Sequence, residues 1–198
     1  MNTEQRRKRL ANEILNCHMC DGMNEPQISE ALPGWGDVRS RVMIVGQSLC
    51  RQCMDAKEPF YQHSGDYITR AVELAGKRKK DVFITNLVHC HPPGNRKSHR
   101  DEIDHCKGYL HRELDIVKPI LVVGLGKDAK AELKSYLSES HELSWPLAKK
   151  PSLRPKDSAI PYLLFPEHPG SLRFKHTADR QYWAPSLARA IRWAFDVC

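Results

Sequence analysis

Short runs of consecutive apolar residues recur along the chain, and each is bounded by polar or turn-forming residues. Runs of about four residues that are rich in Val and Ile are typical of strands buried on both faces. Such runs lie at 42–45, 82–85, 120–123 and 162–165. The hydrophobic pattern therefore predicts four strands at the centre of one sheet.

Apolar residues at helical spacing occupy most of the chain around these runs. They predict helices over the ranges 4–16, 65–76, 98–117, 127–138 and 178–196. We expect Thr3 to cap the first helix, and Ser98 with Asp101 to form a capping box on the third. Pro185 should mark a break or a new first turn in the last helix. Strands that alternate with helices predict an α/β fold, here a three-layer α/β/α sandwich around a central four-stranded, mainly parallel sheet.

The length of 198 residues fits a single domain spanning residues 1–198. The polar segment 139–159 is expected to be a surface excursion rather than a linker. No apolar run is long enough to cross a membrane, and residues 1–9 lack the apolar core of a secretion signal, so we expect a cytoplasmic protein. We also expect it to be a monomer. Ligands of parallel sheets bind beyond the carboxyl ends of the strands, where the segment 46–48, Asn86 and the segment after Phe165 lie.

A formal net charge of +7 and a pI near 9.1 favour polyanionic partners such as nucleic acids. Basic side chains that neutralise phosphates release counterions, which drives such binding. The same charge could also serve solubility alone. Composition therefore permits a DNA-binding protein without requiring one.

The cysteines are the strongest chemical signal in the chain. Their number, seven, is odd, which argues against a secreted disulfide framework. Cys17 and Cys20 form a C-x-x-C pair at a helix end, Cys90 follows a predicted strand, and Cys106 lies on the next helix. Four thiolates can hold either an iron–sulfur cluster or a tetrahedral zinc ion, and their spacing leaves both open.

A second C-x-x-C pair, Cys50 and Cys53, lies just after the first predicted strand. It has no matching partner pair elsewhere in the chain. We therefore expect these two residues to be ordinary free thiols.

Taken in order, several short motifs resemble the iron–sulfur uracil-DNA glycosylases, the family numbered four, over nearly the whole chain. The matching motifs are Cys17-x2-Cys20, Pro33-Gly34-x-Gly36, Gly46, Pro59-Phe60 with Gly65, the run 81–86 ending in Asn86, Cys90-x-Pro92-Pro93-Gly94-Asn95-Arg96, Cys106 and His168-Pro169. The resemblance implies a structural [4Fe-4S] cluster on the four matching cysteines, which ties the N-terminal helix to the core. On this ground we prefer a cluster to zinc.

The resemblance also implies a site that accepts a base flipped out of DNA. Phe60 would stack on the base, and Asn86 would read its polar edge. His168 would stabilise the negative charge on the departing base. Gly46 and Ser48 would line the pocket. Without the resemblance, Phe60 would be taken for a core residue and Asn86 for the cap of a turn.

Three residues after His168 are candidates for contact with DNA. Ser171 belongs to the same loop, Leu172 would fill the emptied position in the base stack, and Arg173 would hold a phosphate. The alternative is an ordinary loop that leads into the last helix.

The first motif departs from the family pattern. Similar family members carry Gly-Glu-Ala-Pro-Gly where this chain has 46–50, Gly-Gln-Ser-Leu-Cys, and Cys53 replaces a second acidic residue. Gln47 cannot accept a proton at neutral pH, but its carbonyl oxygen can orient a water molecule.

Two classes of function follow. The first is a monofunctional DNA glycosylase that removes uracil or a modified pyrimidine, with Gln47, Asn86 and His168 as catalytic residues. A variant of this reading is excision of hypermodified phage cytosine in antiviral defence. The second is a non-catalytic protein that binds damaged or modified DNA.

Overall fold

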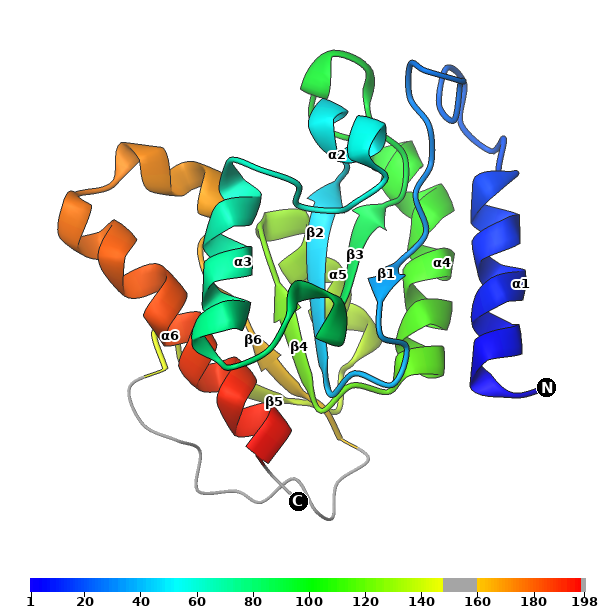
Figure 1. Cartoon of the computed structure of the whole chain (residues 1–198). Helices are drawn as coiled ribbons and strands as arrows, with labels where there is room; N and C mark the ends of the chain where they lie inside the picture. The colour runs from blue at the N-terminus through cyan, green and yellow to red at the C-terminus, as the bar shows by residue number, and fades with distance from the viewer. Residues whose placement is uncertain (148–159, 197–198) are drawn as a thin grey trace.

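The computed structural model describes residues 1–147 and 160–196. Within them, a six-stranded sheet has the order β1-β3-β2-β4-β6-β5 (Figure 1). The four predicted strands form its centre, and all neighbours are parallel except β1, which runs antiparallel to β3. The strands are β1 (Trp35–Gly36), β2 (Val42–Ser48), β3 (Phe83–Val88), β4 (Leu121–Gly124), β5 (His141–Leu143) and β6 (Tyr162–Leu164).

The predicted α/β class is therefore confirmed, while the strand number was too low. The two additional strands, β1 and β5, lie at the edges of the sheet and are only two and three residues long. Short edge strands that are half-exposed have no continuous apolar run, so the hydrophobic pattern does not reveal them. Within the polar segment 139–159, residues 141–143 form β5, whose side chains are mostly exposed. Residues 148–159 lie outside the described residues.

Helices cover both faces of the sheet (Figure 1). One core contains side chains of α3 and α6 packed on one face, and a second core contains those of α1, α4 and α5 on the other. These helices are α1 (Thr3–Leu15), α3 (Ser64–Leu74), α4 (Arg100–Val117), α5 (Lys127–Tyr136) and α6 (Thr177–Asp196), with a short α2 (Arg51–Ala56) after β2. The central strands β2, β3, β4 and β6 alternate their side chains between the two cores, so the centre of the sheet is buried on both faces.

Local capping corrects two of the predictions. Asn2, and not Thr3, caps α1: its side chain accepts a hydrogen bond from the Gln5 backbone N–H at 2.9 Å, and its own backbone N–H donates to the Gln5 Oε1 at 2.9 Å. On α4 the box is shifted by one residue, since the Glu102 carboxylate accepts from the His99 N–H at 2.7 Å. Pro185 lies inside α6, which continues through it.

The carboxyl ends of β2, β3, β4 and β6 meet at one edge of the sheet because these strands are parallel. The loops that follow them are brought together there, as expected for ligand sites of parallel sheets. No helix in the described part of the chain is long and apolar enough to cross a membrane.

Candidate active site

Three of the predicted pocket residues meet at the carboxyl ends of β2 and β3. Gly46 on β2 pairs with Asn86 on β3. A Cβ atom on Gly46 would lie 2.4 Å from the Asn86 Oδ1 and 2.7 Å from the Phe60 Cζ, both far inside van der Waals contact. A glycine is therefore needed at 46 so that the amide and the aromatic ring can approach each other.

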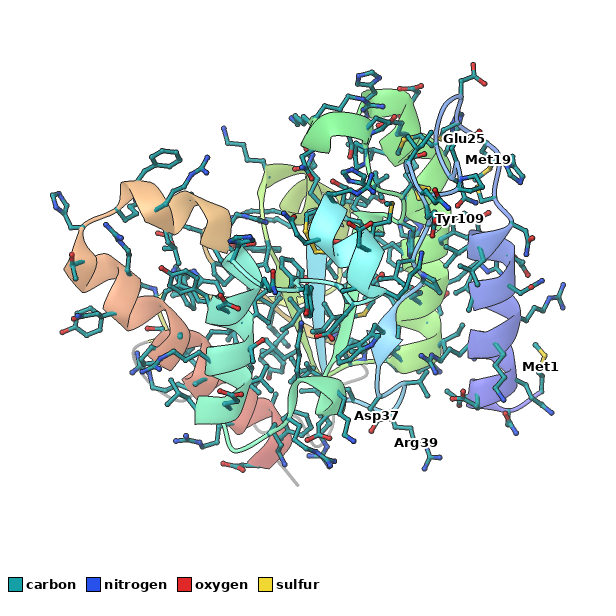
Figure 2. All side chains as sticks on the ribbon, turned by 45° about the horizontal axis from the view of Figure 1, so that its top comes forward. Met1, Met19, Glu25, Asp37, Arg39 and Tyr109 are labelled. Carbon is teal, nitrogen blue, oxygen red and sulfur yellow. A yellow bond between two sulfur atoms is a disulfide. The ribbon has the colours of Figure 1, made fainter. Side chains whose placement is uncertain are left out.

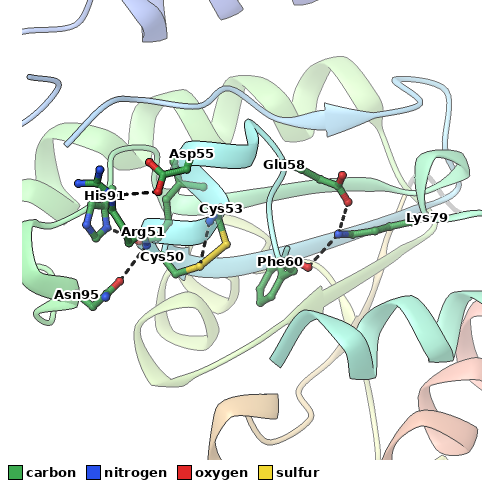
Figure 3. Close-up of a disulfide and its surroundings, with 10 residues drawn as sticks. Cys50, Arg51, Cys53, Asp55, Glu58, Phe60, Lys79, His91 and Asn95 are labelled. Atoms are coloured by element: carbon green, nitrogen blue, oxygen red, sulfur yellow. Dashed lines mark hydrogen bonds and ion pairs between the residues drawn. A yellow bond between two sulfur atoms is a disulfide. The ribbon is translucent and has the colours of Figure 1, made fainter. Parts of the chain in front are cut away.

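The backbone of Phe60 is held in an unusual conformation. Its φ is +51°, in the left-handed region that is uncommon for an aromatic residue. The Lys79 ammonium donates to the Phe60 carbonyl at 2.9 Å and pairs with Glu58 at 2.6 Å (Figure 3). A Cβ on Gly65 would lie 1.7 Å from the same carbonyl oxygen, so only glycine fits there. These contacts fix the direction of the ring.

Lys79 was missed by the sequence reasoning. The basic segment 77–80 has the composition of a solvated surface, yet the Lys79 side chain is only 11% exposed. It also lies 5.7 Å from the centroid of the Trp35 ring. No local pattern distinguishes it from its basic neighbours, because its role depends on a loop that lies 19 residues away in the sequence.

Asn86 has an unusual environment for a polar side chain. It is 4% exposed and lies beside the Phe60 ring at Gly46. An amide offers both a donor and an acceptor, so it can pair with the polar edge of a pyrimidine.

His168 faces the same group of residues from the loop after β6. Its ring centroid lies 6.3 Å from that of Phe60. The Gly170 N–H donates to the His168 Nδ1 at 3.1 Å, which places the imidazole proton on Nε2. Burial lowers the pKa of His168 below 6.5, so the ring is neutral at pH 7. His168 therefore offers one N–H donor, at Nε2.

Gln47 extends from the same end of β2 toward α5. Its Nε2 donates to the Asp128 Oδ2 at 2.8 Å, and the Lys97 Nζ lies 3.4 Å from that oxygen. Ser48, the next residue, ends β2 and is half-buried. Asp128 was not predicted, because 81 residues separate it from Gln47 in the sequence.

The residues after His168 form the 3₁₀ helix η4 (Pro169–Phe174). The Ser171 hydroxyl donates to the His168 carbonyl at 2.7 Å and so closes the turn. Leu172 is 2% exposed and packs in the core against α3 and α6, so it is not available at the surface to fill a base stack. The exposed apolar side chain of this segment is Phe174, at 78%, and it lies under the Arg173 guanidinium.

The four predicted ligand cysteines are brought together on the other side of the sheet. Cys17, Cys20, Cys90 and Cys106 are free thiols that line one small cavity. Figure 2 shows the region, where the loop that carries Met19 lies beside α4 near Tyr109. Burial and the neighbouring cysteines raise the pKa of Cys20 to about 11 and that of Cys90 to about 12. Their thiolates would therefore need a cation for compensation.

Histidines contact two of these cysteines. The backbone N–H of His89 donates to the Cys106 Sγ at 3.3 Å, and the His105 Nδ1 lies 3.3 Å from the Cys20 Sγ. In the described residues, no group of three or more His, Cys, Asp or Glu side chains is arranged to hold a single metal ion. Four thiols around one cavity are the donor set that either an iron–sulfur cluster or a zinc ion uses.

Cys50 and Cys53 form a disulfide at the start of α2, with their Cα atoms 5.1 Å apart (Figure 3). The prediction of free thiols was therefore wrong. Cys50 is the N-cap of α2, and Cys53 lies in the first turn. Residues three apart lie on one face of a helix, which brings the two sulfurs together.

A buried carboxylate connects the cysteine side of the sheet to the rest of the core. Glu113 on α4 accepts from the Gly34 N–H at 2.7 Å and from the Thr85 hydroxyl at 2.5 Å, and it lies 3.3 Å from the His89 Nε2. His89 in turn contacts Cys106. This network explains the Pro33-Gly34 motif, which brings a backbone N–H to Glu113.

Comparison with known proteins identifies the family. A family model described as the uracil DNA glycosylase superfamily matches residues 33–187, which contain the pocket, Cys90, Cys106 and His168. The chain belongs to this superfamily. Membership accounts for the α/β sheet and for the order of the motifs along the chain.

Curated relatives within the superfamily are similar to parts of this chain. The Type-4 uracil-DNA glycosylase of Pyrobaculum aerophilum is 38% identical over 113 residues, 57% of each chain. Those of Archaeoglobus fulgidus and Saccharolobus solfataricus are 32% and 33% identical over 120 and 125 residues, 61% and 63% of this chain and 59% and 57% of theirs. The chain thus spans just under three-fifths of the length of these relatives.

Proposed function

We propose that this protein is a monofunctional DNA glycosylase that hydrolyses the N-glycosidic bond of a flipped-out uracil or modified pyrimidine and leaves an abasic site. The observation that carries the proposal is the meeting of Phe60, the buried Asn86 amide and the His168 Nε2–H around Gly46. An aromatic face, a base-reading amide and a donor for the leaving base are the parts that such a reaction needs. The names of the relatives, Type-4 uracil-DNA glycosylase, support uracil as the first substrate to test.

These residues support cleavage of the glycosidic bond in three steps. The base stacks on Phe60, and the Asn86 amide pairs with its polar edge. The C1′–N bond breaks with its electron pair passing to the base, whose negative charge the His168 Nε2–H stabilises. A water molecule then bonds to C1′ of the oxocarbenium-like sugar, and its surplus proton leaves to solvent water.

DNA is the proposed partner. Extrusion of a base costs a few kcal/mol of stacking, which contacts to the phosphates and to the emptied stack must offset. The net charge of +7 and the exposed Arg173 favour phosphate binding. Because Leu172 is buried, the exposed Phe174 beside it is the apolar side chain of this loop that is free to contact the stack.

The proposal is tested by incubating the protein with oligonucleotides that contain uracil, hypoxanthine or glucosylated hydroxymethylcytosine, in single and double strands. Alkaline cleavage at the position of the modified base is the expected result and reports an abasic site. Excision of the glucosylated base alone would support a role in antiviral defence. Tight binding with no abasic site on any substrate would contradict the glycosylase and support the non-catalytic binder.

We further propose that Cys17, Cys20, Cys90 and Cys106 hold a [4Fe-4S] cluster. When bound, the cluster would supply a structural link between the loop after α1, the end of β3 and α4. The alternative occupant is zinc, which four thiolates also accept.

Cys106→Ser should therefore abolish the brown colour of the purified protein and lower its iron content from about four atoms per chain. It should also lower the Tm, because one of the four links is lost. Cys198→Ser removes a thiol elsewhere in the chain and should leave colour and iron unchanged. A colourless wild-type protein with stoichiometric zinc would contradict the cluster.

A further inference from the structure

Cys50 and Cys53 are joined to each other, whereas the other cysteines in the described residues are free thiols. Cys50 is partly exposed, and Cys53 is 5% exposed. A disulfide framework would engage most of the cysteines of a chain. One neighbouring pair in a molecule that otherwise keeps its thiols free is typical of redox-active cysteines.

The disulfide closes a short ring within the cap and first turn of α2. A cross-link over so few residues restricts the unfolded chain much less than one that closes a long loop. The two cysteines also stay within one helical turn when the S–S bond is open. The bond can therefore break and form again without the loss of any other element.

The backbone on both sides of Cys50 is anchored by contacts that do not involve sulfur. The Leu49 carbonyl accepts from the His91 Nδ1–H at 3.1 Å, and the Arg51 N–H donates to the Asn95 Oδ1 at 3.0 Å (Figure 3). These contacts remain when the disulfide opens. Cys50 is thus held beside Cys53 in the reduced form, which favours closure of the bond.

The two cysteines have different environments. The Cys53 backbone N–H donates to the Cys50 Sγ at 3.2 Å. In the reduced form this hydrogen bond favours the Cys50 thiolate, and the thiolate is the form that exchanges with disulfides. Cys50 is also the more exposed of the two. Both features select Cys50 as the sulfur that meets a reactant from solution.

The pair lies in the segment that joins β2 to Phe60. The Glu58 N–H donates to the Cys53 carbonyl at 3.1 Å, and the Glu58 carboxylate pairs with Lys79, which also holds the Phe60 carbonyl. A change in the covalent state of Cys50 and Cys53 therefore occurs in the segment that leads into the aromatic ring of the pocket.

We propose that Cys50 and Cys53 form a reversible thiol–disulfide exchange site for low-molecular-weight thiols, with Cys50 as the exchanging sulfur. A small thiolate attacks the Cys50 Sγ, the bond to Cys53 breaks, and its electron pair leaves on the Cys53 Sγ, which takes a proton from water. A second small thiolate attacks the small-molecule sulfur of the mixed disulfide and releases the Cys50 thiolate. Two small thiols are thereby oxidised to their disulfide, and the pair is reduced. Neither step uses the proposed glycosylase activity.

Equilibration of the full chain with glutathione tests whether the exchange is reversible. The protein is kept free of oxygen in buffers with different ratios of reduced to oxidised glutathione, quenched with acid and alkylated, and the peptides that contain residues 50–53 are weighed. The pair should change from disulfide to dithiol within this series and return when the ratio is reversed. A pair that stays oxidised at the highest ratio, or stays reduced in oxidised glutathione alone, would overturn the proposal.

Two matched variants test the assignment of Cys50. Cys53→Ser leaves the Cys50 thiol, and Cys50→Ser leaves the Cys53 thiol with a serine at the N-cap position, where its hydroxyl can still accept a backbone N–H. Oxidised glutathione should form a mixed disulfide with Cys53→Ser at least about tenfold faster than with Cys50→Ser. The double variant should gain no glutathione in these peptides. Equal rates in the two single variants, or the reverse order, would contradict the role of Cys50.

Discussion

His168→Ala is expected to lower the rate of base excision by about 10²–10³-fold, the usual cost of removing one donor to a developing negative charge. The His168 Nε2–H is the donor that the site directs toward the leaving base, since Nδ1 is occupied by the Gly170 N–H. Single-turnover excision measures the effect. His176→Ala, an exposed histidine nearby, should keep the wild-type rate.

The pH dependence tests the same assignment. Because burial lowers the pKa of His168 below 6.5, the neutral ring persists as the pH falls from about 8 to 6.5. The excision rate should therefore stay level over this window and decline only at lower pH, where protonated Nδ1 can no longer accept from Gly170. The same shift lowers the stability of the folded protein as the pH falls below 6.5, because the unfolded chain binds the proton first. A rate that rises as the pH falls through 6.5 would show instead that the charged ring is the working form.

Glu113→Ala is expected to destabilise the protein by about 3–5 kcal/mol, the cost of removing one partner from a buried charged network. The substitution leaves the Gly34 N–H and the Thr85 hydroxyl without their acceptor. Burial opposes a charge on His89, but the charges of Glu113 and Cys106 outweigh it and raise the pKa of His89 to about 10. Without Glu113, His89 loses the main partner of that charge.

Urea unfolding measures this effect as a shift of the midpoint at constant m-value. Glu113→Gln, which keeps the shape and one acceptor oxygen, should cost less than Glu113→Ala. Glu139→Ala removes an exposed acid and should change the free energy of unfolding by no more than about 0.5 kcal/mol. A Glu113→Ala protein as stable as the Glu139→Ala control would show that the network contributes nothing.

Much of the site could be predicted because its parts lie in local motifs. Gly46, Asn86 and His168 each follow a strong apolar run, and parallel strands place their carboxyl ends at one edge. The resemblance then assigned their roles. The burial of Leu172 could not be predicted, since the turn of η4 decides whether a residue after His168 faces the core or the solvent.

What the sequence by itself determined is the α/β class, the four central strands and the four cysteines that now line one cavity. The strands and the fold class follow from the runs of apolar residues, which must be buried in the folded protein. The cysteines were found from their spacing and from the resemblance to a known family. Only the tertiary structure decided that Asp128 holds Gln47, that Glu113 binds Gly34 and Thr85, and that Lys79 supports Phe60. Each of these contacts joins separate elements, and it exists only once the helices and loops have docked on the sheet.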